Sequence, residues 1–297
     1  MSETGIGTRD SEGISAALLN GTICVVARGW SSDGLQASIS DVSVEPVTWS
    51  VQSTGFKTSA TPSIVVEGGI FHVYSRDLAG GGIMHMTSAD GKTWSGADYT
   101  GLNTSGGVCA IRFEDELHLL YRDVDGGGIL HSIKSGSRWI GTKYIGINAR
   151  WSISAAVLQD KLCVVCKDNE GISPNASSGI MCAVLQNETW SSAYTRFNTT
   201  GTPGIAVVPI AFADREAGDA PAVPLRDVFQ VWNRDPEGGG ILQMISSDGL
   251  SWRGGQYIGI NTNGPVGATS SSTRLWLFYT QDLGSKHDIV STMYTLS

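Results

Sequence analysis

Charged residues are scarce in this chain of 297 residues: Asp, Glu, Lys and Arg make up 16% of it, against about 25% in a typical soluble domain. No uninterrupted apolar run approaches the ~18 residues of a membrane-spanning helix, so we expect no insertion into a membrane. The N-terminal sequence MSETGIGTRDSEG has neither the basic start nor the apolar stretch of a secretory signal. We therefore expect a protein that is cytoplasmic or released without a signal peptide.

Basic residues are outnumbered, with 20 Lys and Arg against 28 Asp and Glu and a net charge of -8. Because phosphate binding needs a basic surface, nucleic acid is excluded as the expected partner. The five cysteines are an odd number, which argues against a disulfide framework and for a reducing compartment. A bond between Cys163 and Cys182 is left open. The chain has no GxSxG, HExxH or P-loop signature, and we predict no cofactor.

Glycine, by contrast, is abundant, with 38 residues in the chain. Each Gly costs about 1 kcal/mol in a helix, so glycines spread along the chain make long helices unfavourable. The hydrophobic fraction of 41% can still support a packed core. The composition therefore indicates a folded protein with many tight turns.

An internal repeat explains these turns. Three near copies of one segment, each an aromatic or aliphatic strand followed by Arg-Asp and three glycines, start at Phe71, Leu117 and Phe229. More divergent copies start at Ile23, Leu162 and Leu275. A tryptophan marks the register of five copies, at Trp49, Trp94, Trp139, Trp190 and Trp252.

Each copy reads as four short strands separated by Gly-rich turns, and repeats of ~40–50 residues of this kind are typical of β-propeller blades. We predict an all-β fold, a six-bladed β-propeller with four-stranded antiparallel blades, formed by 1–297 as a single domain. The predicted blades are 13–59, 60–105, 106–152, 153–200, 201–263, and 264–297 plus 1–12. The sixth copy lacks its last strand, whereas Thr4–Thr8 matches Thr100–Thr104. The N-terminal strand is therefore expected to complete the C-terminal blade.

Two regular loops are expected on one face of the ring. Arg-Asp-x-x-Gly-Gly-Gly joins strands 2 and 3, and Tyr-x-Gly-x-Asn leads from strand 4 into the next blade. Their candidate binding residues are Arg76, Asp77, Asn103, Arg122, Asp123, Asn148, Arg234, Asp235 and Asn261. Two interpretations stay open, because an Asp before a Gly-rich turn often only caps that turn, while glycines leave room for a ligand.

The turn Ser88–Trp94, echoed by Ser246–Trp252, resembles the Asp-box of sialidase-type propellers and is expected on the opposite face. We interpret it as a device for turning and packing. Its tryptophan and its equivalents, Trp94, Trp139 and Trp252, either pack between blades or present a ring to a sugar.

Matched polar residues recur at a fixed hairpin spacing: His72 and His85, His118 and His131, Cys163 and Cys182, and Gln230 and Gln243. Matched identities suggest directly paired positions on strands 2 and 3. Because a Gln pair cannot replace a His pair at a metal, we predict polar pairs beside a ligand pocket and no metal site.

The blade skeleton is an aromatic strand ending in Tyr-x-x-Asp, a turn, Ile-x-polar, and a Trp about 10 residues later. It resembles the fungal six-bladed propeller lectins of the Aleuria fucose-lectin type. The resemblance implies sugar sites between adjacent blades, built by an Arg, a Glu two residues after the strand-3 Ile, and an aromatic ring. In this chain that Glu position holds His85, His131 and Gln243, which is a departure from the fucose pattern.

Polar groups that recur blade after blade favour a binding protein over an enzyme, which needs one unique set of converging groups. We predict a lectin without catalysis that binds terminal fucose, N-acetylglucosamine or galactose-type residues of glycoproteins or cell surfaces. A homodimer is compatible with this interpretation. The alternatives are a sialidase-like propeller glycoside hydrolase and a protein-interaction propeller.

Overall fold

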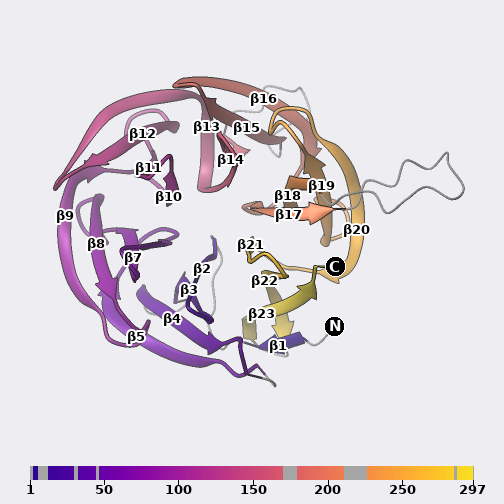
Figure 1. The fold of residues 1–297 in the computed structure, drawn as a ribbon, viewed down its shortest axis with the longest axis horizontal. Helices are drawn as coiled ribbons and strands as arrows, with labels where there is room; N and C mark the ends of the chain where they lie inside the picture. The colour runs from indigo at the N-terminus through magenta and orange to yellow at the C-terminus, as the bar shows by residue number, and fades with distance from the viewer. Residues whose placement is uncertain are drawn as a thin grey trace, which may run out of the picture.

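The computed structural model describes residues 3–5, 13–29, 33–44, 47–169, 179–210, 226–283 and 286–296. Within these ranges all regular structure is β-strand, so no described helix could cross a membrane. The strands pair antiparallel with their sequence neighbours. This confirms the predicted all-β propeller class, and Figure 1 shows the sheets arranged around a common centre.

Three sheets each contain four consecutive strands. The first holds β2 (Ser15–Leu19), β3 (Thr22–Arg28), β4 (Gly34–Asp41) and β5 (Ser50–Lys57). The second holds β6 (Ser63–Glu67), β7 (Ile70–Arg76), β8 (Gly82–Ser88) and β9 (Ser95–Asn103). The third holds β17 (Gly204–Ile210), β18 (Arg226–Arg234), β19 (Gly240–Ser246) and β20 (Arg253–Asn261).

A seven-stranded sheet lies between the second and third of these. Its strands are β10 (Val108–Phe113), β11 (Glu116–Arg122), β12 (Gly128–Ser135), β13 (Arg138–Leu158), β14 (Lys161–Asp168), β15 (Gly179–Gln186) and β16 (Thr189–Asn198). The long β13 pairs with β12 through its first half and with β14 through its second half. The sequence predicts a boundary between blades after residue 152, and in the structure a bulge between Ala149 and Ile153 redirects the strand in this region without ending it.

The last sheet joins the two ends of the chain. Its strands are β21 (Val266–Ser270), β22 (Arg274–Leu283), β23 (Lys286–Thr295) and β1 (Glu3–Gly5). Thr4 is paired with Ser291, so the N-terminal strand completes the C-terminal sheet as predicted. We call each run of four paired strands a blade, numbered from β2–β5 as blade one to this last sheet as blade six.

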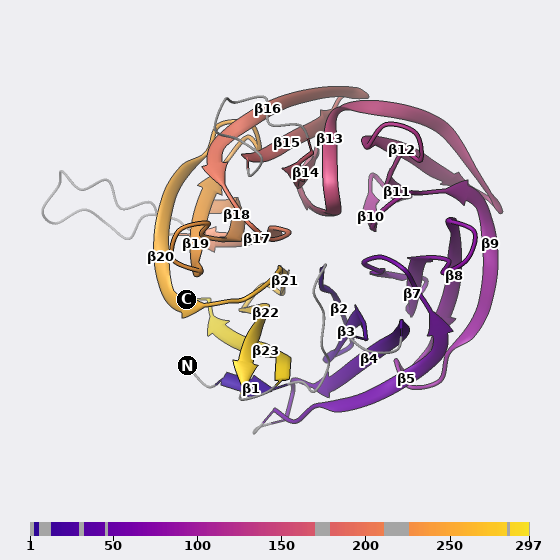
Figure 2. The same cartoon turned by 180° about the vertical axis from the view of Figure 1, so that it is seen from behind.

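Apolar side chains pack between successive blades. Five clusters join blades one to six in order, and a sixth packs Ile23 and Val25 of blade one against Phe278 of blade six. A blade with two buried faces explains strands such as TICVVAR, in which five consecutive residues are buried. The first strand of each blade lies near the centre of the ring, and the last strand lies at its outer rim, as both views show (Figures 1 and 2).

The Asp-box-like turns add a second kind of contact between blades. In blade five, Asp248 Oδ1 accepts hydrogen bonds from the N–H groups of Leu250 (2.9 Å) and Ser251 (2.7 Å), and Gly249 N donates to Ser246 Oγ at 2.8 Å. Trp252 Nε1 donates to Gly249 O at 3.0 Å. The turn therefore fixes Trp252 where it packs on the cluster between blades four and five.

Gly249 should be required both for its backbone and for its close packing. Its φ is +77°, and a Cβ would lie 2.6 Å from Val184 Cγ2. Gly68 has a φ of +59° with open space around it. We expect Gly68→Ala to cost about 1 kcal/mol from backbone strain alone, and Gly249→Ala about 2–4 kcal/mol because overpacking adds to it. Urea unfolding with an unchanged m-value measures both, and equal losses would contradict the packing argument.

Candidate functional site

The predicted arginines act as clamps between blades. Arg76 Nε donates to Thr104 O at 2.8 Å, and its Nη1 donates to Ser59 Oγ. We call the segment that joins the last strand of one blade to the first strand of the next a junction. Ser59 lies in the junction before blade two, and Thr104 lies in the junction after it. One planar guanidinium thus connects two junctions, a geometry for which its fork of N–H donors is suited.

The same clamp recurs in blades three and five. Arg122 donates to Ala149 O and to Ser105 Oγ, both at 2.8 Å. Arg234 donates to Thr262 O at 2.8 Å and to Thr200 Oγ1. A Cβ on Gly127, whose φ is +77°, would lie 2.9 Å from Arg122 Nη2, so this glycine lets the loop pack on the guanidinium.

The aspartates that follow the arginines cap their turns. Asp77 Oδ2 accepts a hydrogen bond from Gly80 N at 3.0 Å, and Asp235 Oδ1 accepts one from Glu237 N at 3.2 Å. Asp123 Oδ1 makes a longer contact of 3.5 Å with Asp125 N. These are the contacts expected when an Asp side chain caps a Gly-rich turn. A sugar contact by the same carboxylates stays a prediction.

The asparagines are paired with tyrosines that are not among the residues predicted from the sequence. Tyr99 OH donates to Asn103 Oδ1 at 3.1 Å. In a regular strand these residues would be about 13 Å apart, but β9 has two extra residues between its pairings with Gly82 and Met84. This bulge brings the two side chains together. A Cβ on Gly82 would lie 2.9 Å from the Tyr99 ring, so the ring covers that glycine.

Four blades repeat this tyrosine–asparagine unit, and we call its members the rim tyrosines. The other hydrogen bonds are Tyr144 to Asn148 (3.1 Å), Tyr194 to Asn198 (2.9 Å) and Tyr257 to Asn261 (3.1 Å). The four rings are 39–55% exposed. Blade one has Ser53 and Lys57 at the corresponding positions of its bulge. The Tyr-x-Gly-x-Asn motif contains three of these tyrosines, but the sequence alone did not show that their rings would be exposed.

The matched polar pairs meet inside the blades. His72 lies opposite Thr87, and His85 lies opposite Tyr74, so the predicted direct pairing is wrong. The partners are diagonal, a separation that long side chains on one face can bridge. His72 Nδ1 and His85 Nε2 are 2.9 Å apart.

The equivalent atoms of His118 and His131 are 2.8 Å apart, and Gln243 Nε2 donates to Gln230 Oε1 at 2.6 Å. His131 is only 5% exposed, which places it away from the surface. Cys163 and Cys182 occupy the same diagonal positions, and both are buried free thiols. Burial raises the pKa of Cys182 to about 11.

The predicted tryptophans pack between blades. The rings of Trp139 and Tyr74 meet edge to face at a centroid distance of 5.7 Å, and Trp94 packs on the cluster between blades one and two. In blade two, the Asp77 turn and the Trp94 turn lie at opposite ends of β8, a strand about 20 Å long. The fifteen predicted residues therefore fall in three places: the Arg, Asp and Asn residues at one blade end, the His and Gln residues inside, and the tryptophans at the other end.

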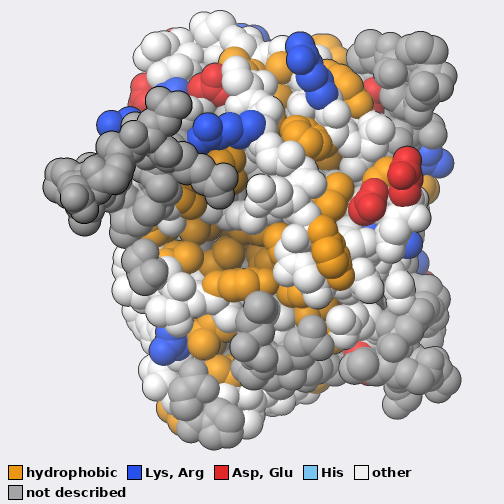
Figure 3. Space-filling view, turned by 90° about the vertical axis from the view of Figure 1, so that its right-hand side faces the viewer, with side chains coloured by type: hydrophobic (Ala, Val, Ile, Leu, Met, Phe, Trp, Pro, Cys, Tyr) orange, Lys and Arg blue, Asp and Glu red, His pale blue; other side chains and the backbone are white. Residues whose placement is uncertain are grey.

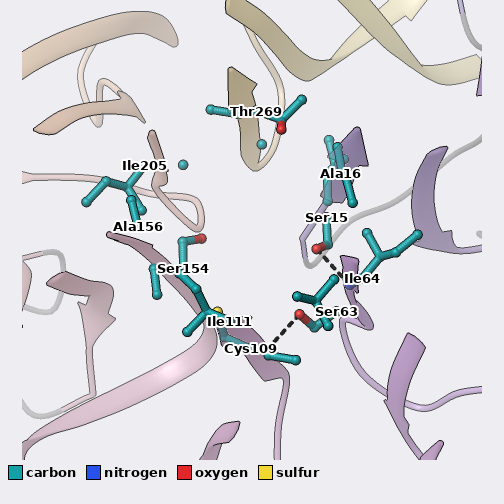
Figure 4. Close-up of a pocket in the computed structure, with 18 of the residues that line it drawn as sticks. Ser15, Ala16, Ser63, Ile64, Cys109, Ile111, Ser154, Ala156, Ile205 and Thr269 are labelled. Atoms are coloured by element: carbon teal, nitrogen blue, oxygen red, sulfur yellow. Dashed lines mark hydrogen bonds between the residues drawn. The ribbon is translucent and has the colours of Figure 1, made fainter. Parts of the chain in front are cut away.

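A cavity of about 430 Å³ lies at the centre of the ring, lined by the first strands of all six blades. Figure 4 shows Ser15 and Ser63 bound to neighbouring blades. Their Oγ atoms accept hydrogen bonds from Ile64 N (3.1 Å) and Ala110 N (2.8 Å). Among the described residues, no acidic, basic, histidine or tyrosine side chain lines this cavity. Nor does the described part of the chain contain a cluster of three His, Cys, Asp or Glu residues that could hold a metal.

No family model and no curated protein matches the chain by sequence. Solved structures are similar in fold. A mutant of the Aleuria aurantia lectin in complex with alpha-methyl-L-fucoside has a TM-score of 0.66 at 12% identity, covering 97% of both chains. A Hadza microbial sialidase has a TM-score of 0.64 at 15% identity, over 97% of this chain and 66% of that one.

The Bacteroides ovatus protein Xyloglucan PUL GH43B has a TM-score of 0.55 at 10% identity, over 94% of this chain and 64% of that one. The chain thus spans slightly less than two thirds of this protein and of the sialidase. At such identities the likeness concerns the fold, and it supports a lectin-like propeller. The similar structures include both a lectin and enzymes.

The histidine pairs should make stability depend on pH. Burial, followed by the positive charge of the partner, lowers the pKa of His85 and of His131 to about 4, below the ~6.5 of an unfolded chain. Their contribution is therefore complete above pH 6.5 and is lost as the pH falls towards 4.

In His72→Gln/His85→Gln, which copies the Gln pair of blade five, we expect Tm to fall by less between pH 7 and 4.5 than in the unmodified protein. The reverse exchange, Gln230→His/Gln243→His, should increase that fall. Differential scanning calorimetry measures both variants, and identical pH slopes for all three proteins would refute the assignment.

Proposed function

We propose that this protein is a lectin that binds terminal sugar residues of glycoproteins or cell surfaces at several repeated sites, without catalysis. The sites lie at the blade ends that carry the Asp77, Asp123 and Asp235 turns and the rim tyrosines. Fucose, N-acetylglucosamine and galactose-type residues are the candidate ligands. The fold likeness to a lectin in complex with alpha-methyl-L-fucoside supports this assignment.

The observation that carries the proposal is the repeated exposed ring beside hydrogen-bonding groups. A sugar has an apolar face that can stack on a tyrosine ring. In blade two, the ring of Tyr99 lies over Gly82, which closes the turn that begins at Asp77 through the hydrogen bond Asp77 N to Gly82 O (2.7 Å). Asn103 accepts from Tyr99 with its Oδ1, and its Nδ2 carries two donors for sugar hydroxyls.

Repetition gives such a surface its strength. A single tyrosine–sugar contact is weak, because one half-exposed ring covers only a small apolar area of the sugar. Four sites on one rigid ring can bind a surface that carries many copies of the same sugar, and the joint affinity then exceeds that of each site. The proposed ligand is therefore a densely displayed glycan.

A glycoside hydrolase is the main alternative, because the same scaffold carries a sialidase. Sialidases use a tyrosine nucleophile, and most other glycosidases need two carboxyl groups about 5–9.5 Å apart. The central cavity, where a propeller enzyme would bind its substrate, has no tyrosine and no acidic side chain among its described lining residues. A panel of aryl glycosides tests this alternative, and turnover of any of them would overturn the non-catalytic assignment.

Removing the rim tyrosines should abolish lectin activity while the fold persists. The variant replaces Tyr99, Tyr144, Tyr194 and Tyr257 by Ser, the residue that blade one carries as Ser53. We expect at least a tenfold loss of signal on a glycan array, because all four sites lose their ring. The control is Ile140→Ser, which removes an exposed apolar side chain (51% exposed) from the rim strand β13.

Unchanged glycan binding by the four-tyrosine variant would refute these sites. An unmodified protein that binds no glycan on the array would refute the lectin assignment and favour a protein-interaction propeller. Circular dichroism of the variant, which should match the unmodified protein, separates loss of binding from loss of fold.

A further inference from the structure

The junction between blades three and four departs from the repeat. Four other junctions follow a described rim strand, after Lys57, Asn103, Asn198 and Asn261. Two residues further on, each has an uncharged polar residue, and the residue after that is small. These pairs are Ser59 and Ala60, Ser105 and Gly106, Thr200 and Gly201, and Asn263 and Gly264. Here Asn148 is followed by Ala149, Arg150 and Trp151. A small polar residue is thus replaced by a cation, and a small residue by the largest aromatic one.

A second change accompanies the first. The clamp arginine of blade four is replaced by Lys167, whose Nζ donates to Thr200 O at 3.4 Å. A single ammonium cannot bridge two junctions as a guanidinium does. In blades two, three and five the clamp reaches back to the hydroxyl of the preceding junction. At this junction Arg150 stands in place of that hydroxyl, where a clamp guanidinium would face another guanidinium.

Trp151 is unusually accessible for a tryptophan. It is 48% exposed, and the guanidinium carbon of Arg150 lies 5.4 Å from the centroid of its ring. Its backbone O accepts a hydrogen bond from Gly107 N at 3.2 Å, which holds the residue against blade three. The next residue, Ser152, lines the central cavity and is hydrogen-bonded to Thr61 at 2.5 Å. The backbone of Trp151 therefore lies next to a residue that lines the cavity.

Arg150 lies at this junction, and the charged groups of Lys167 and Arg234 meet at Thr200, in the junction that follows blade four. Lys167 is 8% exposed, and burial together with the positive charges of Arg150 and Arg234 lowers its pKa. Lys167 and Arg234 both donate to Thr200, one to its carbonyl and one to its hydroxyl. The neighbouring carboxyl group of Asp168 is buried, with 4% of the residue exposed.

The cations are notable because the chain as a whole has a net charge of -8. On the side of the ring shown in Figure 3, by comparison, basic and acidic side chains are scattered around hydrophobic ones. An exposed aromatic ring beside a local excess of positive charge suits a ligand that is flat and apolar on one side and negatively charged at its edge.

We propose that Trp151 and Arg150 form a separate binding site for a hexuronic acid residue, with the sugar ring stacked on Trp151, its carboxylate held by Arg150, and the buried charge of Lys167 adding to the attraction. The ligand class rests on the proposed carbohydrate-binding function, whereas the site shares no residue with the rim tyrosines. It is a single site, because the other described junctions that follow a rim strand have an uncharged polar residue (Ser59, Ser105, Thr200 or Asn263) and a small residue instead.

The test compares methyl β-D-glucuronide with methyl β-D-glucoside by isothermal titration calorimetry. The glucuronide should bind at least fivefold more tightly, and 0.5 M NaCl should remove most of that difference because salt screens the charges. Arg150→Ser/Trp151→Gly, which restores the residues of the junction at Ser105 and Gly106, should weaken glucuronide binding at least tenfold. Arg150→Ser alone keeps the ring and should lose mainly the preference for the charged probe.

Lys92→Ser is the matched control, since it removes an exposed cation from a turn at the other end of blade two, and it should bind the glucuronide normally. The four-tyrosine variant should also bind it normally. Equal binding of the two probes, no binding of the glucuronide, or full binding by Arg150→Ser/Trp151→Gly would overturn the proposal. If neutral glycans still bind on the array, such a failure leaves the lectin function standing.

Discussion

The whole structure depends on the burial of both faces of each blade by its neighbours. A four-stranded sheet with apolar residues on both sides is stable in water only when both sides are covered. The ring of blades covers them, and the contact of Ile23 and Val25 with Phe278 closes the set of clusters between the first and last blades. Pairing of the N-terminal strand with β23 supports that contact by holding together the two chain ends.

This constraint explains the residues that first looked functional. Trp139 and its equivalents fill the space between blades, and the Asp-box-like turns hold Trp94 and Trp252 for the same purpose. Arg76, Arg122 and Arg234 tie adjacent junctions together through hydrogen bonds. Repetition is therefore not by itself a sign of ligand binding, because every blade needs the same contacts with its neighbours.

Candidate functional residues are found at two kinds of position. At one, a repeated side chain is not needed for packing, and at the other, a junction departs from the repeat. The rim tyrosines expose about half of each ring, although full burial would stabilise the fold more. The junction at Trp151 lacks the arginine clamp that the junctions at Ser59, Ser105 and Thr200 have, and it has an exposed ring and a cation instead. The repeated feature suits many equal ligands, and the broken one suits a single different ligand.

The sequence alone determined the strands, the repeat, the pairing of the two ends and the turn chemistry. These depend on local rules: alternation and apolar runs mark strands, and Gly, Asp and Asn mark turns. Only the tertiary structure decided that His72 meets His85 diagonally inside the blade and that Trp151 is exposed. Those outcomes depend on register, bulges and packing between blades, which bring together residues far apart in the chain and cannot be read from the spacing within one repeat.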